Sequence, residues 1–195
     1  MSVFEAFVES IWAGPLLWMS LYISDYYLTI ACARLYRAQD KVVFEGSYEI
    51  TPFYQADVNA LRRVSPRFVL VLLSSTAYLF LVRVIAGPGS GLIGLYELAL
   101  GAMILTEATV HMRHLRNWFL FSKVVSHLKG RMEYPRGIML RNSAFEVLVV
   151  AALYVSLFLV TANLFLLGGA IACCALSFKH YRLATRFDAA SKKAA

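Results

Sequence analysis

The sequence predicts an all-α polytopic integral membrane protein, a five-helix transmembrane bundle with its N-terminus outside and its C-terminus cytoplasmic. Composition is the first observation: of 195 residues 59% are hydrophobic and 16% charged, against about 45–50% and about 25% in soluble domains. Second, several apolar runs approach or exceed the roughly 20 residues that a helix needs to cross a bilayer. Third, Lys and Arg residues gather between these runs, as they do in cytoplasmic loops.

The predicted spans follow the apolar runs in chain order. They are residues 11–33, 68–87, 92–110, 143–160 and 164–182, with cytoplasmic loops at 34–67 and 111–142. Spans two and three are separated by GPGSG at Gly87–Gly91, a segment too rich in helix breakers to be anything but a turn. Residues 1–195 are expected to form a single transmembrane domain, since no repeat or second domain divides the chain.

The last two spans come from one run, Val147 to Phe178, that holds no charged side chain. As a single helix rising about 1.5 Å per residue it would reach roughly 48 Å, well beyond the roughly 30 Å of a hydrocarbon core. A hairpin that turns near Thr161–Asn163 returns the basic tail to the cytoplasm. Eighteen of the nineteen Lys and Arg residues then face that side, and Arg83 is the exception. This count sets the predicted orientation.

One pair of opposite charges is expected inside the bundle. An ionisable side chain in hydrocarbon is costly unless it is paired or hydrated. Arg83 lies four residues before the Gly87–Gly91 turn and Glu97 lies six residues after it, so both reach a similar depth in an antiparallel hairpin. We therefore expect a structural ion pair between Arg83 and Glu97 that holds spans two and three together.

Spans one and three carry polar stripes in their inner halves. Span one places polar side chains at i, i+3 and i+7, and span three places an acid and two histidines at i, i+4 and i+7, so each set lies on one helical face. No Lys or Arg is available at that depth to neutralise the acids. The candidate site for an ion, a substrate or a metal is Tyr22, Asp25, Thr29, Glu107, His111 and His114.

Three interpretations of these stripes stay open. A divalent metal such as zinc, iron or manganese is one, since carboxylate and imidazole groups are its usual ligands; the candidates are Asp25, Glu107, His111 and His114. A polar passage for protons, cations or a small solute is another. Alternatively, the groups form hydrogen bonds between helices and only fix the bundle.

The preferred functional hypothesis is the binding or translocation of an ion or small polar solute at this acidic cluster. The first alternative is a metal-dependent membrane enzyme that acts on a lipid or another membrane substrate, and the second is a structural or accessory subunit of a membrane complex. The chain shows no P-loop, GxGxxG, GxSxG or TVGYG motif that would select a known chemistry. No catalytic residue is assigned from the sequence.

The expected partners are the lipid bilayer and anionic headgroups at its cytoplasmic face. Nucleic acid is not expected despite the net charge of +7, because the basic residues interleave with apolar spans. Small residues on the last span, Gly168, Ala172 and Ala175, would let span four or a second subunit approach closely, which leaves a homo-oligomer or a complex partner open. The expected location is the plasma or inner membrane, or the endoplasmic reticulum in a eukaryote.

The two inner loops differ in pattern. His114–Lys129 predicts an amphipathic helix, which would either lie on anionic headgroups or continue span three and pack against its neighbours. The tyrosine-rich segment Glu45–Tyr54 is expected to be a solvated connector with anchoring aromatic residues, in preference to an ordered interfacial loop.

Overall fold

A computed structural model describes residues 2–87 and 90–194 of the chain, with side chains described through residue 189. Within these residues, five helices are long and apolar enough to cross a membrane. They are α2 (Ala13–Arg37), α4 (Pro66–Ile85), α5 (Ile93–Phe119), α6 (Arg136–Thr161) and α7 (Leu164–Ala194). The expectation of five long apolar helices is therefore confirmed, although α5 continues and α6 begins farther into the second loop than predicted.

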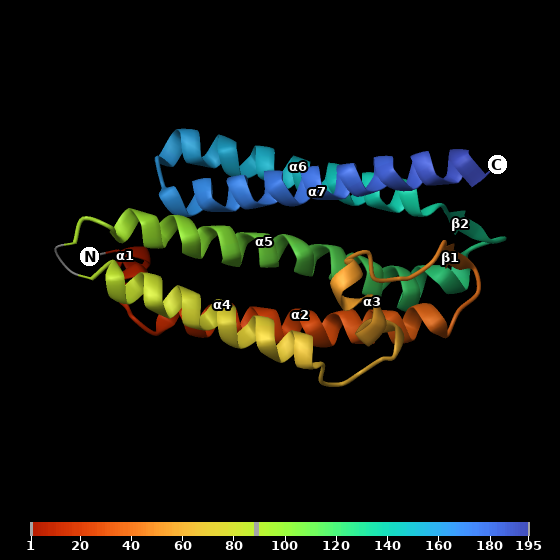
Figure 1. Cartoon of the computed structure of the whole chain (residues 1–195), viewed down its shortest axis with the longest axis horizontal. Helices are drawn as coiled ribbons and strands as arrows, with labels where there is room; N and C mark the ends of the chain where they lie inside the picture. The colour runs from red at the N-terminus through yellow and green to blue at the C-terminus, as the bar shows by residue number, and fades with distance from the viewer. Residues whose placement is uncertain (1, 88–89, 195) are drawn as a thin grey trace.

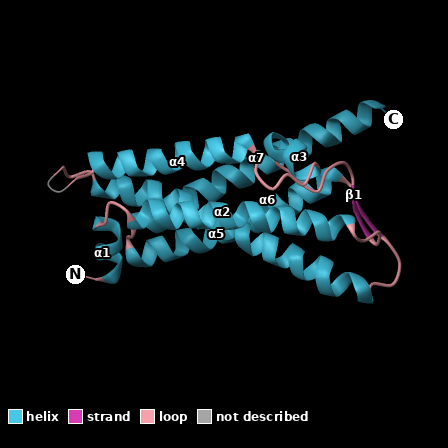
Figure 2. Cartoon of the chain, turned by 90° about the horizontal axis from the view of Figure 1, so that it is seen from below, coloured by secondary structure: helices cyan, strands magenta, loops and turns pink. Residues whose placement is uncertain are grey.

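The long helices lie roughly side by side, and the bundle has two different ends (Figure 1). One end, which we call the turn end, holds α1 (Val3–Glu9) and the connections α4–α5 and α6–α7. The opposite end, the loop end, holds the C-terminus and three short elements. These are α3 (Pro52–Asn59), β1 (Val42–Phe44) and β2 (Met132–Tyr134), and Figure 2 shows them at the same end.

Helix α5 lies between two groups of helices, with α2 and α4 on one side and the α6–α7 hairpin on the other (Figure 1). Its contact with α7 is very close. A Cβ added at Gly101 would lie 1.8 Å from the Phe165 carbonyl oxygen, and one at Gly168 would lie 2.0 Å from the Leu98 carbonyl oxygen. Gly168, in the small-residue strip of α7, thus packs directly against α5. Only glycine permits the two main chains to approach this closely.

The predicted hairpin within the uncharged run is confirmed. Helix α6 ends at Thr161, Ala162 adopts a left-handed conformation with φ of 53°, and α7 begins at Leu164. The Asn163 side-chain oxygen accepts a hydrogen bond from the Phe165 backbone amide at 2.9 Å, which satisfies an otherwise unpaired donor of the new helix. The predicted turn at Gly87–Gly91 includes residues 88–89, which lie outside the described residues.

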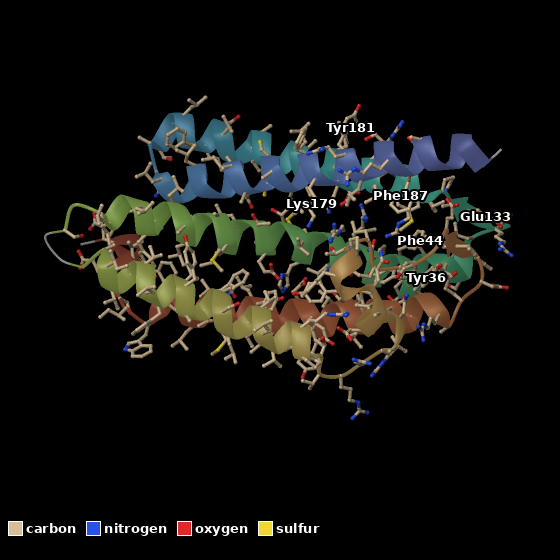
Figure 3. All side chains as sticks on the ribbon, in the orientation of Figure 1. Tyr36, Phe44, Glu133, Lys179, Tyr181 and Phe187 are labelled. Atoms are coloured by element: carbon tan, nitrogen blue, oxygen red, sulfur yellow. The ribbon has the colours of Figure 1, made fainter. Side chains whose placement is uncertain are left out.

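The first loop is ordered, which corrects the expectation of a solvated connector. Strand β1 pairs in parallel with β2, with Val42 opposite Met132 and Phe44 opposite Tyr134. Tyr36 at the end of α2 stacks on Phe44, their ring centroids 5.1 Å apart, and its hydroxyl accepts a hydrogen bond from the Phe44 amide (Figure 3). Aromatic burial therefore ties the loop to the bundle, which the composition of the loop alone did not reveal.

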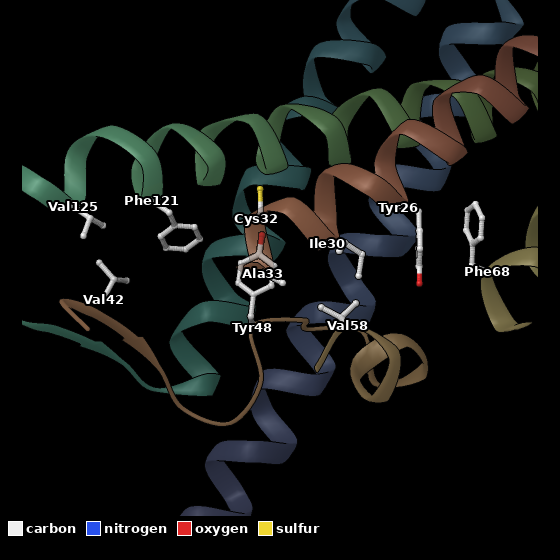
Figure 4. Packing of buried hydrophobic residues seen from close by; sticks show 10 residues of the cluster. All are labelled: Tyr26, Ile30, Cys32, Ala33, Val42, Tyr48, Val58, Phe68, Phe121 and Val125. Atoms are coloured by element: carbon white, nitrogen blue, oxygen red, sulfur yellow. The ribbon is translucent and has the colours of Figure 1, made fainter. Parts of the chain in front are cut away.

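The second loop begins as a continuation of α5. A π-helical turn at Leu120–Val124 and a 3₁₀ turn at Val125–His127 follow the helix directly. Phe121 and Val125 are buried in a cluster with residues of α2, β1 and the first loop (Figure 4), whereas Trp118 is partly exposed. The structure supports the second interpretation of this amphipathic segment: it continues α5 and packs against its neighbours.

Candidate cation site

Helices α2 and α5 bring the two predicted polar stripes together. The closest grouping joins Asp25 of α2 to Glu107 and His111 of α5, whose ligand-type side-chain atoms all lie within 4.8 Å of one another. The spacing of polar residues on each helix predicted which face they occupy, and the packing of α2 on α5 turns these faces toward each other.

The imidazole of His111 is oriented by its own helix. Its Nδ1 lies 2.9 Å from the backbone carbonyl oxygen of Glu107. A carbonyl oxygen only accepts, so Nδ1 carries the hydrogen, and the lone pair of a neutral ring is then on Nε2. Metal-binding histidines are commonly oriented by a backbone carbonyl in this way.

Ser24 is the neighbour of that lone pair. Its hydroxyl oxygen lies 2.7 Å from His111 Nε2 and 2.8 Å from the Leu21 carbonyl oxygen. Since Nδ1 carries the ring hydrogen, the Ser24 hydroxyl donates its one hydrogen to Nε2 or shares it with the Leu21 carbonyl, and a metal ion at Nε2 would have to displace this hydroxyl.

Neither carboxylate is paired directly with a Lys or Arg side chain among the described residues. Glu107 is only 8% exposed and the Asp25 side chain 17% exposed. Glu107 Oε1 and Asp25 Oδ1 have no hydrogen-bond partner among the described residues, and no described Lys or Arg forms an ion pair with either carboxylate. Two ionised carboxylates at this separation repel each other in a buried site, so a shared proton or a bound cation has to neutralise them.

His114 lies beside the group of three. Its Nε2 is 3.1 Å from Thr29 Oγ1 and 3.5 Å from Asp25 Oδ1. The ring is buried, and its Nδ1 has no hydrogen-bond partner among the described residues. Of the four predicted metal-ligand candidates, the structure groups three, and the fourth contacts Asp25 from the side of Thr29.

A metal ion fits this grouping after a small closure. Ligand atoms held about 2.1 Å from one ion lie about 3.0 Å apart at right angles and about 4.2 Å apart when opposite, so three atoms within 4.8 Å of one another need a further closure that side-chain rotation can provide. Two carboxylates and one imidazole suit manganese, iron or zinc. Three protein ligands also leave coordination positions for water or another ligand.

A cavity of about 160 Å³, the site cavity, adjoins the carboxylates. Its lining residues include five of the six predicted site residues, all except His111. Tyr22 and Tyr54 face each other there with their hydroxyl oxygens 2.5 Å apart, which connects α2 to α3. Burial raises the pKa of Tyr54, so its phenol remains a neutral hydrogen-bonding group.

A second cavity of about 290 Å³, the arginine cavity, lies toward the loop end. It shares Glu49, Arg113 and His114 with the site cavity and is also lined by Arg116. Arg113 Nη1 donates a hydrogen bond to Ser143 Oγ at 2.8 Å, which links α5 to α6. The cation candidates are thus next to a polar space at the loop end.

Apolar side chains fill the bundle toward the turn end. Trp18, Leu100 and Ile104 belong to a buried cluster there that also includes Leu79 and Tyr96. Trp18 lies about two helical turns from Asp25 along α2, and Leu100 and Ile104 lie about two turns and one turn from Glu107 along α5. The polar surroundings of the site are therefore concentrated on its loop-end side.

Arg83 does not form the expected pair with Glu97. Its guanidinium donates to the carbonyl oxygens of Val8 at 3.0 Å, of Ala86 at 3.3 Å and of Glu9, and it lies over the Tyr96 ring. No ion pair joins Arg83 to Glu97 among the described residues. Tyr96, next to Glu97 in the chain, lies against Arg83. Two of the three carbonyl acceptors belong to Val8 and Glu9 of α1, a contact that the sequence did not predict.

Sequence reasoning missed four residues around the site, namely Ser24, Glu49, Tyr54 and Arg113. Glu49 and Tyr54 belong to the first loop, whose lack of periodicity gave no indication of burial, yet Glu49 is buried. Arg113 fell in the predicted cytoplasmic loop 111–142, just beyond the predicted end of span three at residue 110. The position of Ser24 directly before Asp25 was the available signal for that residue.

Neither a protein-family model, nor a curated protein, nor a solved structure matches this chain. A functional assignment therefore depends on the residues of the chain itself.

Proposed function

We propose that this chain is a five-span integral membrane protein that binds a divalent transition-metal cation at Asp25, Glu107 and His111. The observation that carries the proposal is the convergence of three ligand-type atoms in an interface where neither carboxylate forms an ion pair with a described Lys or Arg. An ionisable group placed within a span is costly, and a bound cation offsets that cost. The orientation of the His111 ring supports a metal over a proton alone.

We propose that the loop end is cytoplasmic and the turn end external. The arrangement of the helices supports this orientation, because the segments between α2 and α4 and between α5 and α6 lie at one end with the C-terminus (Figure 1). Eighteen of the nineteen Lys and Arg residues lie in those segments, in the helix ends that adjoin them or in the C-terminal part of α7. Positive charge retained on the cytoplasmic side is the general rule for such loops.

The cation would reach its site from the cytoplasmic side. The arginine cavity and the site cavity share three lining residues, and the apolar cluster lies on the opposite side of the carboxylates. This arrangement favours a site that exchanges with one compartment over an open channel. Translocation would additionally require the apolar cluster to separate, and it remains a prediction for a flux measurement in proteoliposomes.

Metal analysis of the purified protein tests the proposal. The protein is dialysed against manganese, iron(II) or zinc, freed of excess metal, and analysed by inductively coupled plasma mass spectrometry. We expect close to one ion per chain, and a loss of at least about tenfold in affinity for Asp25→Asn, Glu107→Gln or His111→Ala, since each removes one ligand.

Two variants serve as matched controls. Glu97→Gln removes a carboxylate from the same helix, and His127→Ala removes an exposed histidine, and neither residue belongs to the group of three. Both should keep the stoichiometry and affinity of the unmodified protein. Equal metal content in the three ligand variants and in these controls, with all variants folded, would refute the proposed site.

A metal-dependent enzyme acting on an amphiphilic substrate is the second candidate. The observation that favours it is the arginine cavity, which places a polar space large enough for a substrate headgroup next to the cation candidates. A metal ion with open positions can activate water there. Incubation of the metal-loaded protein with mixed phospholipid micelles, followed by mass analysis, tests this candidate, and equal product in His111→Ala would exclude it.

A further inference from the structure

An apolar groove of about 460 Å³ runs along the surface between α5 and α6. Met112 of α5 and Phe145 and Val149 of α6 line it, and all three side chains are largely exposed, Phe145 at 68%. Single exposed apolar side chains are expected on any membrane helix, but a groove between two helices can hold an elongated chain.

The groove adjoins the arginine cavity. Arg113, Arg116 and Glu146 line both, so the polar space and the apolar groove meet at these three side chains. One end of the combined surface is therefore polar and the other apolar. This polarity is that of a membrane lipid, with a headgroup attached to an acyl chain.

The charges at the junction favour an anionic headgroup. Arg116 forms an ion pair with Glu146, whereas Arg113 has only the Ser143 hydroxyl as its hydrogen-bond acceptor among the described residues. An arginine has five donors, so most of those of Arg113 are available to a phosphate. Asn117 and Asn142 line the same cavity and supply amide donors.

We propose that the arginine cavity and the apolar groove together form a binding site for one phospholipid with an anionic headgroup. The phosphate contacts Arg113 in the cavity, and an acyl chain lies in the groove along α5 and α6. The inference rests on the proposed membrane location and uses no observation from the cation site. Because Arg113 and the groove both lie near the loop end, the lipid belongs to the cytoplasmic leaflet.

Native mass spectrometry of the full chain tests the site. The protein is equilibrated in detergent micelles that contain phosphatidylglycerol or phosphatidylcholine, in the presence of a chelator so that metal binding does not contribute. We expect one phosphatidylglycerol retained per chain and weaker retention of phosphatidylcholine. Arg113→Gln should weaken phosphatidylglycerol binding about tenfold, because it removes a charge-assisted contact.

A second pair of variants leaves Arg113 in place. Val149→Trp fills the groove, and Leu148→Trp places the same side chain on the neighbouring position of α6, which is similarly exposed but does not line the groove. We expect phosphatidylglycerol retention to fall about tenfold in the first and to stay within about twofold in the second. Equal retention in these two variants would overturn the proposal.

Soluble glycerol 3-phosphate separates a lipid site from a simple phosphate site. As a competitor it should displace phosphatidylglycerol only at concentrations far above that of the lipid, because it lacks the acyl chain. Displacement at equal concentration would show that the cavity binds free phosphate and would also overturn the lipid assignment. Loss of metal binding with retained lipid binding would contradict only the cation proposal.

Discussion

Arg83 shows that a guanidinium within an apolar helix can be satisfied by main-chain oxygens. It donates hydrogen bonds to the carbonyl oxygens of Val8, Glu9 and Ala86. The bonds to Val8 and Glu9 fix α1 against the turn end of the bundle. We expect Arg83→Gln to lower the free energy of unfolding in detergent by about 2 kcal/mol, because buried carbonyls lose a charged donor. Thermal unfolding followed by circular dichroism measures the change.

Glu97→Gln is the informative comparison for Arg83→Gln. A true ion pair would make the two substitutions similarly destabilising, since each leaves one charge without its partner. The observed contacts predict that Glu97→Gln changes the midpoint of unfolding very little. If Glu97→Gln destabilised the protein as much as Arg83→Gln, the result would support the ion pair that the sequence predicted.

The site also shows how far residue-level reasoning extends. Spacing along the chain correctly placed Asp25 on the inward face of α2. It also placed Glu107, His111 and His114 together on one face of α5. It did not determine which histidine joins the carboxylates, because that choice depends on the axial offset between α2 and α5. In the structure this offset places His114 opposite Thr29 and brings Glu107 and His111 of α5 toward Asp25 of α2.

At the scale of elements, the contact between α5 and α7 depends on glycine. We expect Gly101→Ala to destabilise the protein by about 3 kcal/mol, since its Cβ would lie 1.8 Å from the Phe165 carbonyl oxygen, and main-chain atoms cannot move aside without separating the helices. The thermal unfolding midpoint in detergent reports the loss.

Gly94→Ala is the matched control, because Gly94 is also on α5 and also faces α7. The nearest atom to its added Cβ is the end of the flexible Leu164 side chain, at 2.7 Å. That side chain can rotate away, so the substitution should be close to neutral. Equal destabilisation by Gly94→Ala and Gly101→Ala would contradict the assigned role of the close main-chain contact.

Helices were easier to predict than loops for a physical reason. Long apolar runs and a hairpin at Thr161–Asn163 follow from hydropathy and charge, which are properties of the sequence itself. Strands β1 and β2 have three residues each and lie far apart in the chain. Their pairing depends on the packing of Phe44, Tyr36 and Phe121 at the loop end, which no local pattern indicates.

At the scale of the whole molecule, the orientation is open to cysteine labelling. In a variant that lacks Cys32, Cys173 and Cys174, we expect Ser90→Cys to react with an impermeant maleimide on intact cells. Ser126→Cys should react only after permeabilisation, because Ser126 lies at the loop end and Ser90 at the turn end. The reverse pattern would place the loop end outside.

Glu49, Arg113 and His114 line both the site cavity and the arginine cavity, so the two spaces adjoin at these side chains. A negative group bound to Arg113 changes the electrostatic potential at Asp25 and Glu107, so occupancy on one side alters affinity on the other. Thermodynamic linkage requires the effect to be reciprocal. We expect manganese to bind about fivefold more tightly in phosphatidylglycerol than in phosphatidylcholine, with the same factor for lipid binding in the presence of manganese. Through these shared residues, the composition of one leaflet would regulate the metal content of the protein.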